Sequence, residues 1–285
     1  MDALYVMDTE YIRKKEGKVK KRAVARNKRL EPCSPLLLHS TAMYIFVNVQ
    51  NREDYYRDGP TNGRIKVRLE LASGERCLAV PYQEFSMKTI REVRPRAIAI
   101  SGFGGHFQDM KASWFRGIDE VLHQADLPIL CFCGSHQLLA FSYNRDLSKV
   151  KRLHDEPMRK VSPTEDVPRR PKASSTEDYS AYLVGDGFVP ITRLVPDPIF
   201  NGLPKTMIMR CSHYCEVKKL PRGFTVLASS GHCRIEAMRH DTRPLYGTQF
   251  HPEAYEEPWL HGKVLLDNFA RIVDGFWKKK GDRAS

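Results

Sequence analysis

The sequence predicts an α/β fold in which a mixed, mostly parallel sheet is covered by helices on both faces. Two observations support this class. Strand-like and helix-like segments alternate through the first half of the chain, and some strand-like segments, such as AIAI in 97–100 and PILCF in 128–132, are apolar throughout. Strands buried on both faces have this composition, and alternation with helices is typical of parallel sheets. With 285 residues, the chain is long enough to bury a large core.

The N-terminal half supplies the predicted parallel strands and the helices between them. We expect helices at 85–93, 114–124 and 136–143, and strands at 43–50, 77–82, 97–101 and 128–132. The segment RIKVRLEL, residues 64–71, is ambiguous. Its apolar residues alternate as in a strand, whereas the fold requires a helix near this place.

The C-terminal half begins with a change in composition. Residues 144–180 are rich in charged residues, proline and serine, which indicates an exposed insertion or lid rather than a domain boundary. The chain then becomes rich in strand-like segments, from FVPITRLV at 188–195 to PLYGTQF at 244–250. In residues 258–277 apolar side chains recur at helical intervals, so we expect an amphipathic helix that closes the sheet.

The net charge of +12 is concentrated near the N-terminus. Residues 13–29 hold ten Lys or Arg and one Glu. We therefore divide the chain into a basic N-terminal extension, 1–40, and a domain at 41–278. A basic arm can bind nucleic acid or an acidic partner. No aromatic residue interrupts the basic run to stack on bases, so we favour a solvated arm and do not expect a nucleic-acid partner.

The remaining bulk properties indicate a cytoplasmic protein. No run of 18 or more apolar residues occurs, so we expect no membrane span. The segment MDALYVMDTEYIRKK lacks the features of a secretory signal. The seven cysteines are odd in number and irregularly spaced, as expected for reduced thiols.

Cys133 lies where a predicted strand ends and a predicted helix begins, in PILCFCGSHQLLA. A nucleophile on such a turn projects into the crevice at the carboxyl end of the sheet. The helix N-terminus there favours a thiolate and a developing oxyanion. Gly134 and Ser135 are small enough for a sharp turn. From this segment alone, a buried structural thiol is an equally good interpretation.

A second segment, GTQFHPEAY at 247–255, offers a base for that thiol and an orienting group for the base. His251 and Glu253 are two residues apart in a stretch that Pro252 keeps out of a helix, so their side chains leave the chain on the same side. His251 could then polarise Cys133 while Glu253 fixes the imidazole tautomer. The two segments together favour nucleophilic catalysis.

With these two segments the chain resembles the class I glutamine amidotransferases, a family related to γ-glutamyl hydrolases. The family carries a G-x-C-x-G-x-Q elbow and a later G-x-Q-F-H-P-E. Here these blocks read PILCFCGSHQ and YGTQFHPE, while ISGFGG at 100–105 is similar to the family's glycine-rich turn and CSHYCEV to its Ser-His block. The resemblance covers about 43–275 and implies a flavodoxin-like, doubly wound sheet.

The resemblance also implies roles for individual residues. Cys133 would attack the glutamine amide, His251 would serve as base and then acid, and Glu253 would orient the imidazole. The oxyanion would be held by the N–H of Gly134 and by one from the 102–105 turn, at Phe103 or Gly104. Gln137, Ser212, His213 and Tyr214 occupy the positions of substrate-binding residues.

The chain departs from the family pattern at several positions. Cys131 stands where the family has glycine two residues before the nucleophile, and Ser135 where it has glycine two residues after. In the glycine-rich turn, Phe103 replaces a glycine and Gly104 takes the place of a proline. The departures make the oxyanion donor from this turn ambiguous, but the triad is complete, so we expect an active enzyme.

Other candidate residues have simpler interpretations. Cys211, His213 and Cys215 alternate on a predicted strand and could share a metal, but no second ligand pair of zinc-site spacing accompanies them. We therefore predict no metal site and no cofactor. We interpret Cys131 as a core residue and His106 as a polar residue at the rim of the site. GFGGHF matches no nucleotide-binding pattern, so none is expected.

The leading functional hypothesis is hydrolysis of a γ-glutamyl amide through a Cys133 thioester. Glutamine would release glutamate and ammonia, and the ammonia would pass to a separate synthase partner. The alternative is a free-standing γ-glutamyl peptide or amide hydrolase that uses the same triad with a different leaving amine. A minor alternative, from a different class, is a non-catalytic nucleic-acid-binding module that uses the basic extension.

Overall fold

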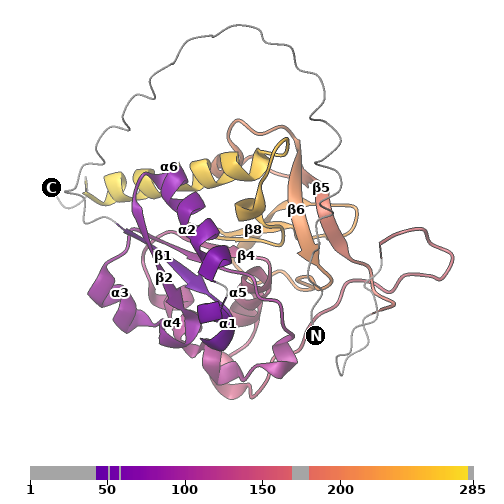
Figure 1. Ribbon diagram of the computed structural model, residues 1–285, viewed down its shortest axis with the longest axis horizontal. Coiled ribbons are helices and arrows are strands. Elements are labelled where there is room, and N and C mark those ends of the chain that lie inside the picture. Colours follow the sequence, from indigo (N-terminus) through magenta and orange to yellow (C-terminus); the bar gives the residue numbers. More distant parts are fainter. Residues whose placement is uncertain (1–42, 51, 58, 169–179, 282–285) are drawn as a thin grey trace, which may run out of the picture. The chain divides into compact units, whose positions relative to one another are not determined.

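One mixed sheet organises the part of the chain that the structure, a computed structural model, describes: residues 43–50, 52–57, 59–168 and 180–281 (Figure 1). The nine strands of this sheet have the order β2-β1-β3-β4-β9-β8-β7-β5-β6. The predicted basic extension at 1–40 lies outside the described residues, so this extension stays a prediction. No helix among the described residues is both long and apolar enough to cross a membrane.

The sheet has a parallel half and an antiparallel half. Strands β2, β1, β3, β4 and β9 pair in parallel, whereas β9-β8, β8-β7, β7-β5 and β5-β6 pair antiparallel. The strands are β1 Met43–Asn48, β2 Arg76–Pro81, β3 Ala97–Ile100, β4 Ile129–Phe132, β5 Gly185–Arg193, β6 Thr206–His213, β7 Phe224–Ser229, β8 Ala237–His240 and β9 Leu245–Thr248.

Helices cover both faces of the parallel half, which confirms the predicted fold class (Figure 1). Ile45 and Val47 of β1 pack in one core with α3, α4 and α5, while Tyr44 and Phe46 pack in a second core with α2 and α6. The helices are α1 Arg52–Arg57, α2 Gly59–Ser73, α3 Met87–Val93, α4 Arg116–Gln124, α5 Gly134–Asn144 and α6 His261–Gly281.

The ambiguous segment 64–71 is helical and lies within α2. Its alternating apolar residues divide between two faces of the helix. Ile65 and Leu69, one turn apart, pack against the core that includes α6, whereas Val67 and Leu71 are 48% and 71% exposed. The strand-like alternation therefore arises from two outward apolar residues that the core does not need.

The segment 144–180 is described up to residue 168. It is exposed at many positions, but Leu147, Leu153, Met158 and Val161 are buried. Met158 and Val161 form a small cluster with Leu183 and Cys233, separate from the two cores of the sheet. This segment is thus tied to the domain by apolar contacts as well as by the polar contacts described below.

Candidate active site

Cys133 stands at a strained turn between β4 and α5. Its φ of +46° lies in a region that few residues other than glycine adopt. The surrounding structure fixes it, because the Cys133 N–H donates to the carbonyl of Thr248 at 2.7 Å and its carbonyl accepts from the N–H of Gln137 at 3.2 Å. Strain of this kind is a feature of nucleophile elbows, so the geometry favours a reactive thiol over a structural one.

The small residues after Cys133 do what the turn requires. A Cβ on Gly134 would lie 2.6 Å from the ring of Phe103, so only glycine fits against that ring. Ser135 is buried, and its φ is not positive, so serine is tolerated where the family has glycine. Cys131 is fully buried in the core, as its position predicted.

His251 and Glu253 follow β9, the strand next to β4 in the sheet. The His251 N–H donates to the carbonyl of Arg210 at 2.8 Å, which fixes this extended stretch. His251 Nδ1 lies 2.8 Å from Glu253 Oε1. Because Glu253 is only 6% exposed, its carboxylate acts on the imidazole with little screening by water.

The pKa of His251 is raised well above its ordinary value. Burial is the largest single influence and lowers this pKa, but the charges of Glu253 and Cys133, together with hydrogen bonds to both, outweigh it. His251 therefore lies between the carboxylate and the thiol and contacts both. The arrangement holds an imidazolium ready to protonate a leaving amine.

Gly102, at the end of β3, is a site residue that the sequence did not single out. A Cβ there would lie 3.0 Å from Cys133 Cβ and 3.3 Å from His251 Cε1. The position thus borders both catalytic side chains. Its signal was available in ISGFGG, but the sequence could not distinguish it from the glycines that follow.

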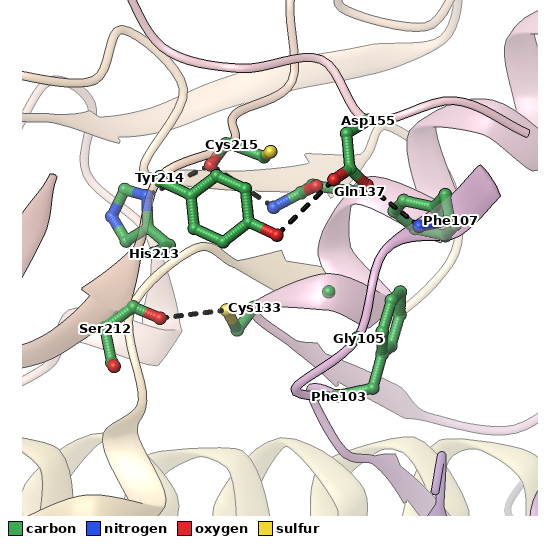
Figure 2. A pocket seen from close by; sticks show the side chains of 11 residues that line it. Phe103, Gly105, Phe107, Cys133, Gln137, Asp155, Ser212, His213, Tyr214 and Cys215 are labelled. Atoms are coloured by element: carbon green, nitrogen blue, oxygen red, sulfur yellow. Dashed lines mark hydrogen bonds between the residues drawn. The ribbon is translucent and has the colours of Figure 1, made fainter. Parts of the chain in front are cut away.

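Gln249 is a second residue that the sequence analysis did not assign. Its buried amide donates to Cys133 Sγ at 3.7 Å and accepts from Gln137 Nε2 at 3.3 Å. Cys133 Sγ also lies 3.9 Å from the carbonyl oxygen of Ser212 (Figure 2). The amide of Gln249 can stabilise a thiolate. It stands two residues before His251 in the same extended stretch, and this spacing could have identified it.

A narrow cavity of about 40 Å³ opens beside Cys133, and it contains most of the predicted substrate-binding residues (Figure 2). Gln137 donates to the carbonyl of Cys215 at 3.3 Å. His213 is buried, and its Nδ1 faces the same carbonyl at 3.1 Å, so its ring supports the loop. The lining residues are Phe103, Gly105, Phe107, Cys133, Gly134, Gln137, Asp155, Ser212, His213, Tyr214 and Cys215.

A wider cavity of about 310 Å³ also includes Cys133. Its walls come from the ends of β1 and β3, from α2 and from the His251–Ala254 stretch. Arg64 and Gln50 provide polar groups at this cavity. Cys133 is therefore reached by two spaces of different size, and a leaving group can depart through one while the remainder of the substrate stays in the other.

The predicted oxyanion donors lie around Cys133. Phe103 lines both cavities, Gly134 lines the narrow one and Gly104 the wide one. The Phe103 ring packs on Phe107 with centroids 4.7 Å apart. These contacts bring Phe103, Gly104 and Gly134 to the nucleophile, and their roles as oxyanion donors stay predictions.

One cluster of metal-binding residue types occurs among the described residues. It joins Cys211 and His213 to Glu236, with ligand atoms within 4.8 Å of one another, and does not include Cys215. Ligand atoms around tetrahedral zinc are closer together, about 3.3–3.8 Å. We therefore propose no metal here.

A cysteine at a strand-end elbow beside a His–Glu pair, on an α/β sheet, defines the class of cysteine-nucleophile amidohydrolases. Comparison with known proteins identifies the family within this class. The family model for class I glutamine amidotransferases matches residues 68–273, and the chain belongs to this family.

Related proteins agree with this assignment. The chain is 35% identical to the glutamine-hydrolyzing subunit of GMP synthase from Archaeoglobus fulgidus over 53% of its own length, but spans only 64% of that relative. It is 51% identical to the protein of the same name from Pyrococcus abyssi, over 65% of the chain and 80% of the relative.

Solved structures show the same fold. A candidate GMP synthase subunit from Thermoplasma acidophilum superposes with a TM-score of 0.61 and 22% identity, over 85% of this chain and all of the other. A glutamine amidotransferase of Thermotoga maritima gives a TM-score of 0.53 and 12% identity, over 83% of this chain and all of the other.

Proposed function

We propose that the protein hydrolyses the side-chain amide of glutamine through a thioester on Cys133. One observation carries this proposal: His251 contacts both the Cys133 thiol and the Glu253 carboxylate, beside a narrow cavity. The match to the class I glutamine amidotransferase family supports it.

The proposed reaction has two stages. The Cys133 thiolate attacks the amide carbon, the His251 imidazolium protonates the nitrogen, and the C–N bond breaks to release ammonia and leave a γ-glutamyl thioester. Water then attacks the thioester while neutral His251 takes its proton. The C–S bond breaks, glutamate leaves, its γ-carboxyl loses a proton to solvent, and the thiolate–imidazolium pair is restored.

We also propose that the ammonia serves a separate synthase subunit, as the names of these relatives suggest. The protein would then be the glutaminase subunit of a GMP synthase. Its partner would be the ATP-pyrophosphatase subunit, docked over the wide cavity so that ammonia does not escape to water. A cytoplasmic location agrees with the free thiols of the six described cysteines.

A γ-glutamyl amide or peptide hydrolase is the second candidate function. The wide cavity favours it to a degree, because about 310 Å³ can hold an amine much larger than ammonia. The two functions share the triad and differ in the leaving group. Binding of nucleic acid through residues 1–40 stays a minor alternative, since this extension lies outside the described residues.

Glutamate release tests the proposal and separates the two candidates. Purified protein is given glutamine or γ-glutamyl peptides, with and without the synthase partner, and Cys133→Ser serves as the control. We expect release from glutamine and a loss of at least about a thousandfold in the variant. Release from substituted amides alone would favour the hydrolase. Equal activity of the variant would contradict both.

A further inference from the structure

Asp155 is an acidic residue of the narrow cavity for which the sequence analysis gave no role. Its side chain is only 3% exposed and lies across the cavity from Cys133 (Figure 2). Among the described residues that line this cavity, Asp155 is the only one with a carboxylate, and none is a lysine or an arginine. The charged group offered to a substrate is therefore negative.

The carboxylate of Asp155 is held in a fixed position by the glycine-rich turn. Its Oδ1 accepts from the N–H of Phe107 at 2.9 Å, and its Oδ2 lies 2.6 Å from His106 Nδ1. The Asp155 N–H donates to Gln108 Oε1 at 3.0 Å. Three successive residues after the turn thus position one residue of the 144–180 segment.

A further contact of Asp155 comes from the substrate side of the cavity. The Tyr214 hydroxyl lies 3.4 Å from Oδ2, a long hydrogen bond, and 2.8 Å from His106 Nδ1 (Figure 2). A carboxylate has about four lone-pair sites, so Asp155 retains capacity for a cationic donor. Because the cavity is narrow, a bound amino acid would displace the Tyr214 hydroxyl from this long contact.

Glutamine supplies the matching charge at the matching end. When its side-chain amide is at Cys133, its α-ammonium lies at the far end of the molecule, toward the opposite wall of the cavity. A buried carboxylate is costly to leave unpaired and binds a cation strongly where water is excluded. A neutral substrate group at this place would gain no such interaction.

We propose that Asp155 binds the α-ammonium group of the substrate and so selects free α-amino acids and γ-glutamyl compounds with an unblocked amine. His106 is then a positioning residue that aims the carboxylate. This inference rests on the proposed function, because it requires the substrate amide to sit at Cys133. It assigns a recognition role to the 144–180 segment.

The test measures binding through protection of Cys133 from iodoacetamide, followed by mass spectrometry of the full chain. This readout requires neither turnover nor the synthase partner. Glutamine is compared with 4-carbamoylbutanoate, which lacks only the α-amino group. In the unmodified protein we expect glutamine to protect at a concentration about 10- to 100-fold lower. Equal protection by the two compounds would overturn the proposal without the use of any variant.

The variant Asp155→Asn keeps the side-chain shape and an acceptor for the Phe107 N–H but removes the charge. We expect the advantage of glutamine to fall to less than about threefold, with the unliganded alkylation rate unchanged. Asp166→Asn, a charge change at an exposed position of the same segment, should keep the full advantage. An unchanged advantage in Asp155→Asn would show a structural role alone. If no compound protects Cys133 in any protein, the proposed function itself fails.

Discussion

The parallel and antiparallel halves of the sheet contribute differently to the site. The parallel half provides Cys133 after β4, His251 and Glu253 after β9, and Gly102 after β3. The antiparallel half provides the Ser212–Cys215 loop at the end of β6, which meets Asp155 from the 144–180 segment. Reactive groups thus come from one half and recognition groups from the other.

This division follows from the physics of the two halves. Adjacent parallel strands deliver their carboxyl ends to one edge, so short motifs far apart in the chain converge without help from long loops. The strands β5 to β8 run in alternating directions, and their loops depend on packing that differs among sequences. Variants in the parallel half should therefore change kcat, and variants in the antiparallel half should change binding or stability.

Gly102→Ala should have the largest effect of three further variants. The added methyl group would lie 3.0 Å from Cys133 Cβ, so the nucleophile or His251 must shift. We expect kcat for glutamate release to fall about 100-fold, with KM little changed. Gly63→Ala, where a Cβ meets no atom within 4 Å, is the control. A normal kcat in Gly102→Ala would show that the triad tolerates displacement.

Glu253→Gln should have a smaller effect on rate but a diagnostic effect on pH dependence. We expect kcat to fall about tenfold. The Glu253 charge raises the pKa of His251, so its removal lowers that pKa. Since protonated His251 is required to release ammonia, activity is lost as pH rises through this pKa. The alkaline limb of the kcat/KM profile should therefore move to lower pH.

The control for this profile is Glu256→Gln, a loss of charge at an exposed position three residues away. Its alkaline limb should coincide with that of the unmodified protein. A shift of the Glu253→Gln limb to higher pH, or no shift, would contradict the assigned role of the carboxylate.

Glu236→Gln tests the antiparallel half, where we expect a change of stability rather than of kcat. Burial raises the pKa of Glu236 from 4.5 to about 7. The folded state then holds a proton that the unfolded state has lost, so the free energy of unfolding decreases as pH rises from about 4.5 to about 7. The variant lacks this loss, and its advantage should grow by about 3 kcal/mol over that range.

Urea unfolding between pH 4.5 and pH 8 measures this difference. Glu92→Gln, at an exposed position of α3, should give a curve parallel to that of the unmodified protein. A pH-independent difference for Glu236→Gln would show that Glu236 is ionised in the folded state throughout the range.

The sequence predicted the parallel half and the triad because these depend on local signals. Continuous apolar runs identified β3 and β4, and the strand-end cysteine and the His-Pro-Glu block identified Cys133, His251 and Glu253. The segment 64–71 resisted interpretation because Val67 and Leu71 are apolar but exposed. Periodicity cannot show which apolar residues the core uses.

The recognition side could not be predicted in the same way. Asp155 lies in a segment whose composition indicates exposure, and it becomes buried only through contacts with Phe107 and His106, almost 50 residues earlier in the chain. His106 had been interpreted as a rim residue, and its ring is in fact buried beside Asp155. Long-range polar contacts of this kind carry no spacing signal.

The most direct test of the catalytic account is covalent capture of the nucleophile. The protein is treated with 6-diazo-5-oxo-norleucine, an electrophile that mimics glutamine, and the modified cysteine is identified by peptide mass spectrometry. The account predicts one label per chain, on Cys133, that glutamine suppresses and that His251→Asn slows. Labelling of another cysteine in preference to Cys133, or labelling that glutamine does not affect, would contradict it.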